Sequence, residues 1–125
     1  MTTANPIERR RNERFALAPM YTDVTVQTVS DLQFRTLEGH AYDISQCGVR
    51  IELDEPLEIG DRVGVHLGLP GEDVEVHAAA DVVWRYESDD DPGPRRMALH
   101  FHDFLSTADR DRLIRFLGSG VQRVA

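Results

Sequence analysis

The 125-residue chain lacks several features that would place it in other classes of protein. It holds a single cysteine, Cys47, which excludes an intrachain disulfide and favours a reducing compartment. No apolar run approaches the roughly 18 residues that a membrane span needs, so we expect no membrane insertion. Residues 1–8 show no apolar segment of the kind found in signal peptides. Together these absences predict a cytoplasmic protein.

Recognised catalytic and metal-binding motifs are missing as well. The chain contains no G-x-x-x-x-G-K-[ST] phosphate loop, no G-x-S-x-G elbow and no H-E-x-x-H helix. His100 and His102 stand two residues apart, but the sequence places no third ligand beside them. The acidic run 89–91 lacks the spacing of an EF-hand. We therefore expect no enzyme activity, no metal ion and no cofactor.

Lysine is absent: all fourteen basic residues are arginine, and twenty-two acidic residues bring the net charge to −8. Such an acidic chain is poorly suited to a nucleic acid polymer as its partner. Genomic codon bias is the simplest reason for the missing lysines, and it weakens any inference from a single arginine. However, Arg9, Arg10, Arg11 and Arg14 fall within six positions. A local positive cluster on an acidic protein suits a small anion.

What the chain does have is the two-residue periodicity of β-strands. Apolar and polar residues alternate in the segments 23–33, 49–53, 63–69, 73–86 and 97–103. A hairpin turn is expected at Glu38-Gly39, with residues 40–45 forming its returning strand. The absence of βαβ units and the short turns predict a mainly β fold, a six- or seven-stranded antiparallel barrel or sandwich.

The period changes near the C-terminus. Ser106 is a good N-cap, and Gly118 is a good residue at which to end a helix. The apolar stripe between them consists of Leu113, Ile114, Phe116 and Leu117. We expect a helix over 107–117 that covers an open end of the barrel. The domain division is then a flexible N-terminal arm, residues 1–13, and a barrel domain, residues 14–125.

Two short polar motifs are the most informative part of the chain. Arg10 and Arg14 form an RxxxR pair, and residues 43–48 form a DxSxxG element. Arginine offers a planar fork of donors for phosphate oxygens and for the O6/N7 edge of guanine. Asp43 is a pure acceptor, suited to the N1–H and N2–H₂ donors of guanine, and the Ser45 hydroxyl can donate or accept. The two motifs together suit an anionic guanine nucleotide.

The spacing of the second motif predicts where its side chains point. Asp43 and Ser45 leave the same face of a strand, and Ile44 leaves the other. With Ile44 in the core, Asp43 and Ser45 are expected to face outward, with Gly48 at the rim. The alternative is that Asp43 and Ser45 only cap the turn that follows them. For Arg10 and Arg14 the alternative is a solvated basic tail.

The chain resembles bacterial PilZ domains. RxxxR is followed by DxSxxG, and then by Gly60-Asp61, Leu69-Pro70, Val83-Trp84 and an amphipathic helix. The resemblance covers about residues 9–118 and implies a small split barrel that binds the second messenger cyclic di-GMP. It also implies which residues contact the ligand: Arg9, Arg10, Arg14, Asp43, Ser45 and Gly48.

Arg9 has a further implication. In the family, a basic residue just before RxxxR goes with two stacked ligand molecules, and Arg9 has this position. Three other arginines are secondary candidates for the same site. Arg11, inside the motif, can add phosphate contacts. Arg95 and Arg96 can reach the same rim.

Two more candidates come from the later strands. Trp84 can flank a guanine, and its alternative is a core aromatic of the barrel. Ala98 stands where the family usually has glycine, so its methyl group can crowd the ligand.

The resemblance implies a receptor that changes conformation when cyclic di-GMP binds, as one or two molecules. The altered surface would then signal to an unidentified protein effector in trans. The alternative is a protein-interaction adaptor of the same fold with a vestigial nucleotide site.

Overall fold

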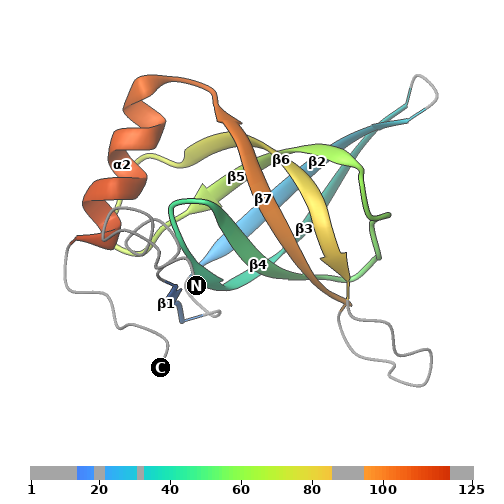
Figure 1. The fold of residues 1–125 in the computed structure, drawn as a ribbon, viewed down its shortest axis with the longest axis horizontal. Coiled ribbons are helices and arrows are strands. Elements are labelled where there is room, and N and C mark those ends of the chain that lie inside the picture. Colours follow the sequence, from blue (N-terminus) through green and yellow to red (C-terminus); the bar gives the residue numbers. More distant parts are fainter. Residues whose placement is uncertain (1–13, 19–21, 31–32, 86–94, 119–125) are drawn as a thin grey trace, which may run out of the picture.

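The fold is that of a computed structural model, which describes residues 14–18, 22–30, 33–85 and 95–118 (Figure 1). The described residues form seven strands and one helix. The strands are β1 (Phe15–Ala16), β2 (Asp23–Ser30), β3 (Gln33–Ile44), β4 (Gly48–Leu53), β5 (Arg62–Gly68), β6 (Val76–Arg85) and β7 (Arg95–Phe104), and the helix is α2 (Thr107–Leu117).

The strands form one antiparallel sheet in the order β1-β3-β2-β5-β6-β7-β4. A further pairing of β3 with β4 joins the two sides of this sheet into a barrel. The short strand β1 pairs with β3 beside the closed ring of six. The expected mainly β fold, an antiparallel barrel with a C-terminal helix, is confirmed.

The core is built by strict alternation along the strands. In β5, Val63, Val65 and Leu67 point into the barrel and are at most 3% exposed. Ile44 of β3 and Ile51 of β4 are fully buried as well. Each such side chain contributes about 1.5–3 kcal/mol by leaving water, so the barrel interior dominates the stability of the fold.

The prediction of a hairpin turn at Glu38-Gly39 is wrong. Both residues lie in the middle of β3, where Gly39 pairs with Val24 on one side and with Leu53 on the other. A Cβ atom at Gly39 would lie 1.9 Å from the carbonyl oxygen of Glu52. Gly39 therefore serves a close approach of two strands and not a turn.

The strand expected over 73–86 is shorter than its pattern suggests. It begins at Val76, and the side chain of Val74 is 52% exposed. The turn at 69–72 is present, with the Glu72 N–H donating to the Leu69 carbonyl at 3.1 Å. The predicted strand was too long because the alternation of apolar and polar residues continues through the loop between this turn and Val76.

Helix α2 lies at one end of the barrel and contacts β6 and β7 (Figure 1). Its N-cap is Ser106, whose Oγ accepts the Asp109 N–H at 3.2 Å. Leu113, Phe116 and Leu117 are buried, whereas Ile114 is 36% exposed. No helix in the described part of the chain is long and apolar enough to cross a membrane.

Asp109 joins this helix to the barrel. Its buried carboxylate accepts the Ser106 hydroxyl at 2.6 Å, the backbone N–H of His77 in β6 at 2.9 Å, and Arg112 Nη1 at 3.3 Å. Burial opposes its charge, but the hydrogen bonds from Ser106 and His77 outweigh burial and lower the pKa of the carboxyl below its ordinary 3.8. The ionised form is therefore the one that stabilises the fold.

We expect Asp109→Asn to lower the free energy of unfolding at pH 7 by about 1–3 kcal/mol, because it removes charge-assisted hydrogen bonds. A depressed pKa gives stability above the ordinary value that is lost as pH falls through the folded value. The difference between wild type and variant should therefore shrink from about pH 4 downward. Urea denaturation at pH 7 and pH 3 measures it, with exposed Asp111→Asn as control. An equal difference at both pH values would contradict this role.

Candidate functional site

The DxSxxG element forms the turn from β3 to β4. Ser45 Oγ accepts the backbone N–H groups of Cys47 at 3.1 Å and of Gly48 at 3.2 Å. The Ser45 N–H donates to the Gly48 carbonyl at 2.8 Å. Ser45 is only 2% exposed, so its hydroxyl shapes the turn, as the capping alternative supposes.

Gly48 is required by the packing of β4 on β7. A Cβ atom at this position would lie 2.3 Å from the backbone oxygen of Leu99. Any larger residue must push the two strands apart. The glycine of the motif thus has a packing reason that holds whether or not a ligand binds.

Asp43 connects the two sequence motifs. Its Oδ1 accepts Arg14 Nη1 at 2.8 Å, and its Oδ2 accepts Arg50 Nη1 at 3.3 Å. The residue is 5% exposed. Asp43 and Ser45 were expected to face outward, within reach of a ligand, but both are buried, whereas Ile44 occupies the core as expected. The charge of Asp43 is buried, but it is paired on both oxygens, as buried charges require.

Strand β1 explains why Arg14 reaches Asp43. Phe15 pairs with Ile44, and Ala16 pairs with Asp43, so the chain just before β1 runs along the end of β3. Phe15 is 9% exposed and anchors this short strand in the core. Among the RxxxR residues the structure describes Arg14, while Arg9, Arg10 and Arg11 lie outside the described residues.

Register places three of the candidate residues, Asp43, Ala98 and Trp84, in one row across five strands. From β1 to β6, the successive pairing partners are Ala16, Asp43, Arg50, Ala98 and Trp84. Arg50 is exposed, Trp84 is 45% exposed, and Ala98 is buried to 9%. The alternative that Trp84 is a core aromatic is wrong. The row gives a charged centre with an aromatic ring at its far end.

Arg50 was missed by the sequence analysis, because it belongs to neither motif. Its signal is the pairing of β3 with β4, which sets Arg50 opposite Asp43. Without this register, the sequence does not distinguish Arg50 from any other surface arginine.

A second pair of charges lies beside the row. Arg96 Nε donates to Glu52 Oε1 at 2.8 Å, and its guanidinium carbon lies 5.5 Å from the centre of the Tyr42 ring. Burial, and next the charge of Asp43, raise the pKa of the Tyr42 hydroxyl. Arg95 pairs with Leu53 at the end of β4. Arg96 therefore extends the row's positive charge, whereas Arg95 lies three positions from Ala98, toward the start of β7.

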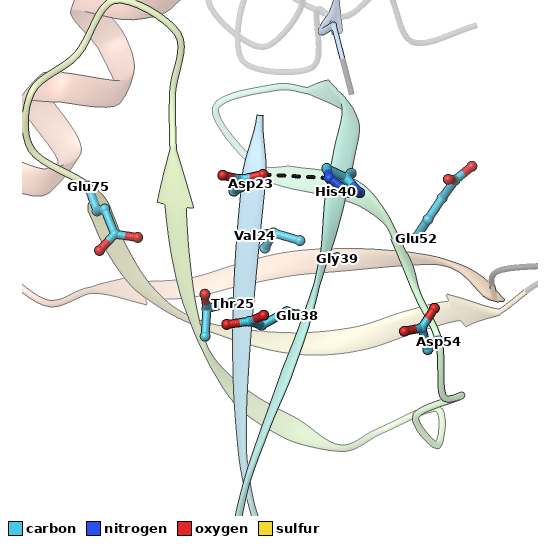
Figure 2. Close-up of a pocket in the computed structure, with 9 residues that line it drawn as sticks. All are labelled: Asp23, Val24, Thr25, Glu38, Gly39, His40, Glu52, Asp54 and Glu75. Carbon is cyan, nitrogen blue, oxygen red and sulfur yellow. Dashed lines mark ion pairs between the residues drawn. The ribbon is translucent and has the colours of Figure 1, made fainter. Parts of the chain in front are cut away.

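Two cavities near these strands differ in charge. One of about 430 Å³ is lined by carboxylates together with His40 and Thr25 (Figure 2). Its acidic residues are Asp23, Glu38, Glu52, Asp54 and Glu75. These side chains would repel a phosphate. Another cavity, of about 290 Å³, is lined by the turn residues Gln46 and Cys47 together with residues of β7 and α2, and Asp103 and Arg110 are its charged side chains besides histidine.

Several solved structures have a fold similar to that of this chain. The PilZ domain of YcgR from Escherichia coli with cyclic di-GMP is 22% identical, with a TM-score of 0.65 over 88% of this chain and 90% of that chain. The Bacillus subtilis inhibitor of motility, MotI/DgrA, is 20% identical, with a TM-score of 0.62 over 86% of this chain and 48% of its own. MrkH, described as a cyclic di-GMP-dependent transcription regulatory factor, is 18% identical, with a TM-score of 0.59 over 86% and 49%.

The chain thus spans about half the length of MotI/DgrA and of MrkH. A comparison with curated proteins gave no match. The solved structures establish a shared fold, and the assignment to a family comes from the sequence. Since the model of the PilZ domain matches residues 8–119, nearly the whole chain, this protein belongs to the PilZ domain family.

Proposed function

We propose that this chain is a receptor for cyclic di-GMP that binds the nucleotide beside Arg14, Asp43 and the turn ending at Gly48. The observation that supports it best is the 2.8 Å contact between Arg14 and Asp43, since it brings two motifs 29 positions apart into one site. Similar solved structures contain cyclic di-GMP, among them the PilZ domain of YcgR. The proposal includes no catalytic step, and the nucleotide is bound and released unchanged.

In this proposal Asp43 first positions the arginines. One N–H of Arg14 is held by Asp43, which leaves the other donors of the guanidinium for phosphate or for the O6/N7 edge of guanine. Arg50 makes the longer of the two contacts, at 3.3 Å. A guanine edge that approaches Asp43 can displace Arg50 at the smaller cost, and the released guanidinium then meets a phosphate.

The aromatic ring on which a guanine base can stack is at the other end of the row. Trp84 is exposed on β6 and paired with Ala98, so a base lying over Ala98 can stack against the indole. The Ala98 methyl group keeps that base slightly farther from β7 than a glycine would. Arg96, two positions before Ala98 on the same strand face, supplies a further positive charge.

Signalling is proposed to use the arm, residues 1–13, with Arg9, Arg10 and Arg11. Like charges in this segment repel until an anion lies between them, so nucleotide binding and closure of the arm are coupled. The reshaped surface then contacts a protein effector. Arg9 favours two stacked nucleotides per chain in this arrangement.

Isothermal titration calorimetry on the wild type tests the proposal. We expect saturation at two molecules of cyclic di-GMP per chain, and much weaker binding of cyclic di-AMP, because adenine reverses the donor and acceptor at position 6. Arg9→Leu should shift the ratio toward one, with Arg35→Leu on the far part of β3 as control. Equal affinity for both dinucleotides would contradict readout by Asp43 and the arginines.

A protein-interaction adaptor is the second candidate, and one observation favours it. Asp43 already has both oxygens paired within the chain, so the site is electrostatically satisfied without a ligand. The same titration separates the two candidates, since an adaptor with a vestigial site gives no heat with cyclic di-GMP.

A further inference from the structure

A cluster of metal-ligating side chains lies on the outer face of β5 and β6, away from the arginine row. His66 of β5 and His77 of β6 are direct cross-strand partners, and Glu75 stands two positions before His77. One ligand atom from each residue lies within 4.8 Å of the other two. Three ligand atoms this close together can share one metal ion. We propose that His66, Glu75 and His77 bind a divalent transition-metal ion, with Zn²⁺ as the best fit.

The backbone fixes where these side chains point. Val65 and Leu67 flank His66 and are fully buried, and Val76 and Ala78, which flank His77, are 0% and 7% exposed. Alternation therefore forces both imidazoles onto the outer face. The two rings stack with their centres 4.0 Å apart and their planes 12° apart. Two imidazole nitrogens are thus held side by side by the sheet itself.

The distances need only a small adjustment to hold an ion. Zinc lies about 2.0–2.1 Å from nitrogen and oxygen ligands, so the corners of its tetrahedron are about 3.3 Å apart. Ligand atoms within 4.8 Å of one another must then close by at most about 1.5 Å. Rotation of the side chains supplies this movement, because Glu75 is exposed and both histidines are only partly buried. The strands do not have to move.

The donor set selects the kind of metal. Imidazole nitrogens suit Zn²⁺, Cu²⁺ and Ni²⁺, whereas Mg²⁺ and Ca²⁺ prefer an all-oxygen shell. Two histidines and one glutamate leave a fourth tetrahedral position for water or another ligand. Such an open shell predicts exchangeable binding and not a permanent structural ion.

Nearby charge favours a cation. Glu75 also lines the acidic cavity described above, and Figure 2 shows it around that cavity with Asp23 and Glu38. Converging carboxylates raise the local concentration of divalent ions. The cavity that is unsuited to a nucleotide is therefore suited to delivering a metal ion.

A bound ion would connect β5 to β6 at the end of the barrel that carries α2. The backbone N–H of His77 is already held by Asp109 of that helix, and the His77 carbonyl accepts the Leu105 N–H at 3.0 Å. Metal binding should therefore stabilise the folded chain as well as occupy the site.

Titration of the metal-free full chain with ZnCl₂ tests the site. Calorimetry should give one Zn²⁺ per chain, with a rise in melting temperature, and Co²⁺ should acquire the strong visible absorption of a tetrahedral site. His66→Ala, His77→Ala and Glu75→Gln should each weaken Zn²⁺ binding by at least about tenfold. His102→Ala, an exposed histidine on β7, is the matched control and should bind like wild type.

Two results would overturn the proposal: no Zn²⁺ binding by the wild type, or equal binding by the wild type and the His66→Ala/His77→Ala variant. Circular dichroism of the metal-free variants checks folding, and Glu75→Gln, a change to an exposed side chain, keeps the test valid if a histidine variant unfolds. The proposal does not depend on cyclic di-GMP, because none of its three ligands lies in the arginine row.

Discussion

Arg14→Ala is expected to weaken cyclic di-GMP binding by about 5- to 150-fold, since a bidentate arginine contact to guanine is worth about 1–3 kcal/mol. The structure gives this arginine a special position. It is held at 2.8 Å by Asp43, and its side chain is 27% exposed, so it is oriented while part of its fork still reaches solvent. An arginine fixed in this way loses little entropy when a ligand binds.

Calorimetry of Arg14→Ala and Arg14→Lys with cyclic di-GMP measures the effect. Lysine keeps the charge but loses the planar fork, so Arg14→Lys should also bind more weakly than wild type. Arg35→Ala, which removes an exposed arginine elsewhere on β3, should bind as tightly as wild type. If Arg14→Ala binds like wild type, the site lies elsewhere on the barrel.

Gly48→Ala is expected to lower the free energy of unfolding by about 3 kcal/mol or more. The added Cβ atom would stand 2.3 Å from the Leu99 carbonyl oxygen, which is backbone and cannot rotate away. Strands β4 and β7 must then move apart, and the buried side chains that they carry lose contact with one another. Cyclic di-GMP binding should fall as well, because Arg50 lies two positions along the displaced strand.

Gly64→Ala is the matched control for this experiment. Gly64 is also a strand glycine, but its Cβ atom would meet nothing closer than 3.8 Å, an ordinary contact. Urea denaturation of both variants should show a large loss for Gly48→Ala and little change for Gly64→Ala. Similar stabilities would mean that β4 and β7 have room to adjust.

Local patterns predicted much of this fold. The alternation of Val63, Val65 and Leu67 identified β5, and Ser106 marked the start of the helix. The error at Gly39 has a physical cause. Glycine is common both in turns and where two strands approach closely. At Gly39 the position of the Glu52 carbonyl shows that the second reason applies, and the sequence does not contain that information.

The site was less predictable, because it depends on which strands pair. The motifs named Arg14 and Asp43, but not that the short strand β1 would bury Asp43 between two arginines. Arg50 enters only through the β3–β4 register. Neither His66 nor His77 belongs to a motif, and only the pairing of β5 with β6 sets them opposite one another. Assignments for Arg9, Arg10 and Arg11 stay predictions.

The row from Ala16 to Trp84 also has a consequence for folding kinetics. Its central pairing joins Arg50 to Ala98, which are 48 positions apart in sequence. Contacts between residues so far apart in sequence form late in folding, because the chain loses the entropy of closing a long loop before the contact contributes any favourable energy. A partly folded chain therefore contains no row, and a nucleotide that binds across it has affinity for the native state alone. Under the proposed function, the ligand then stabilises the native state by an amount that grows with the ratio of its free concentration to Kd, and a newly synthesised chain does not bind it until the barrel has closed.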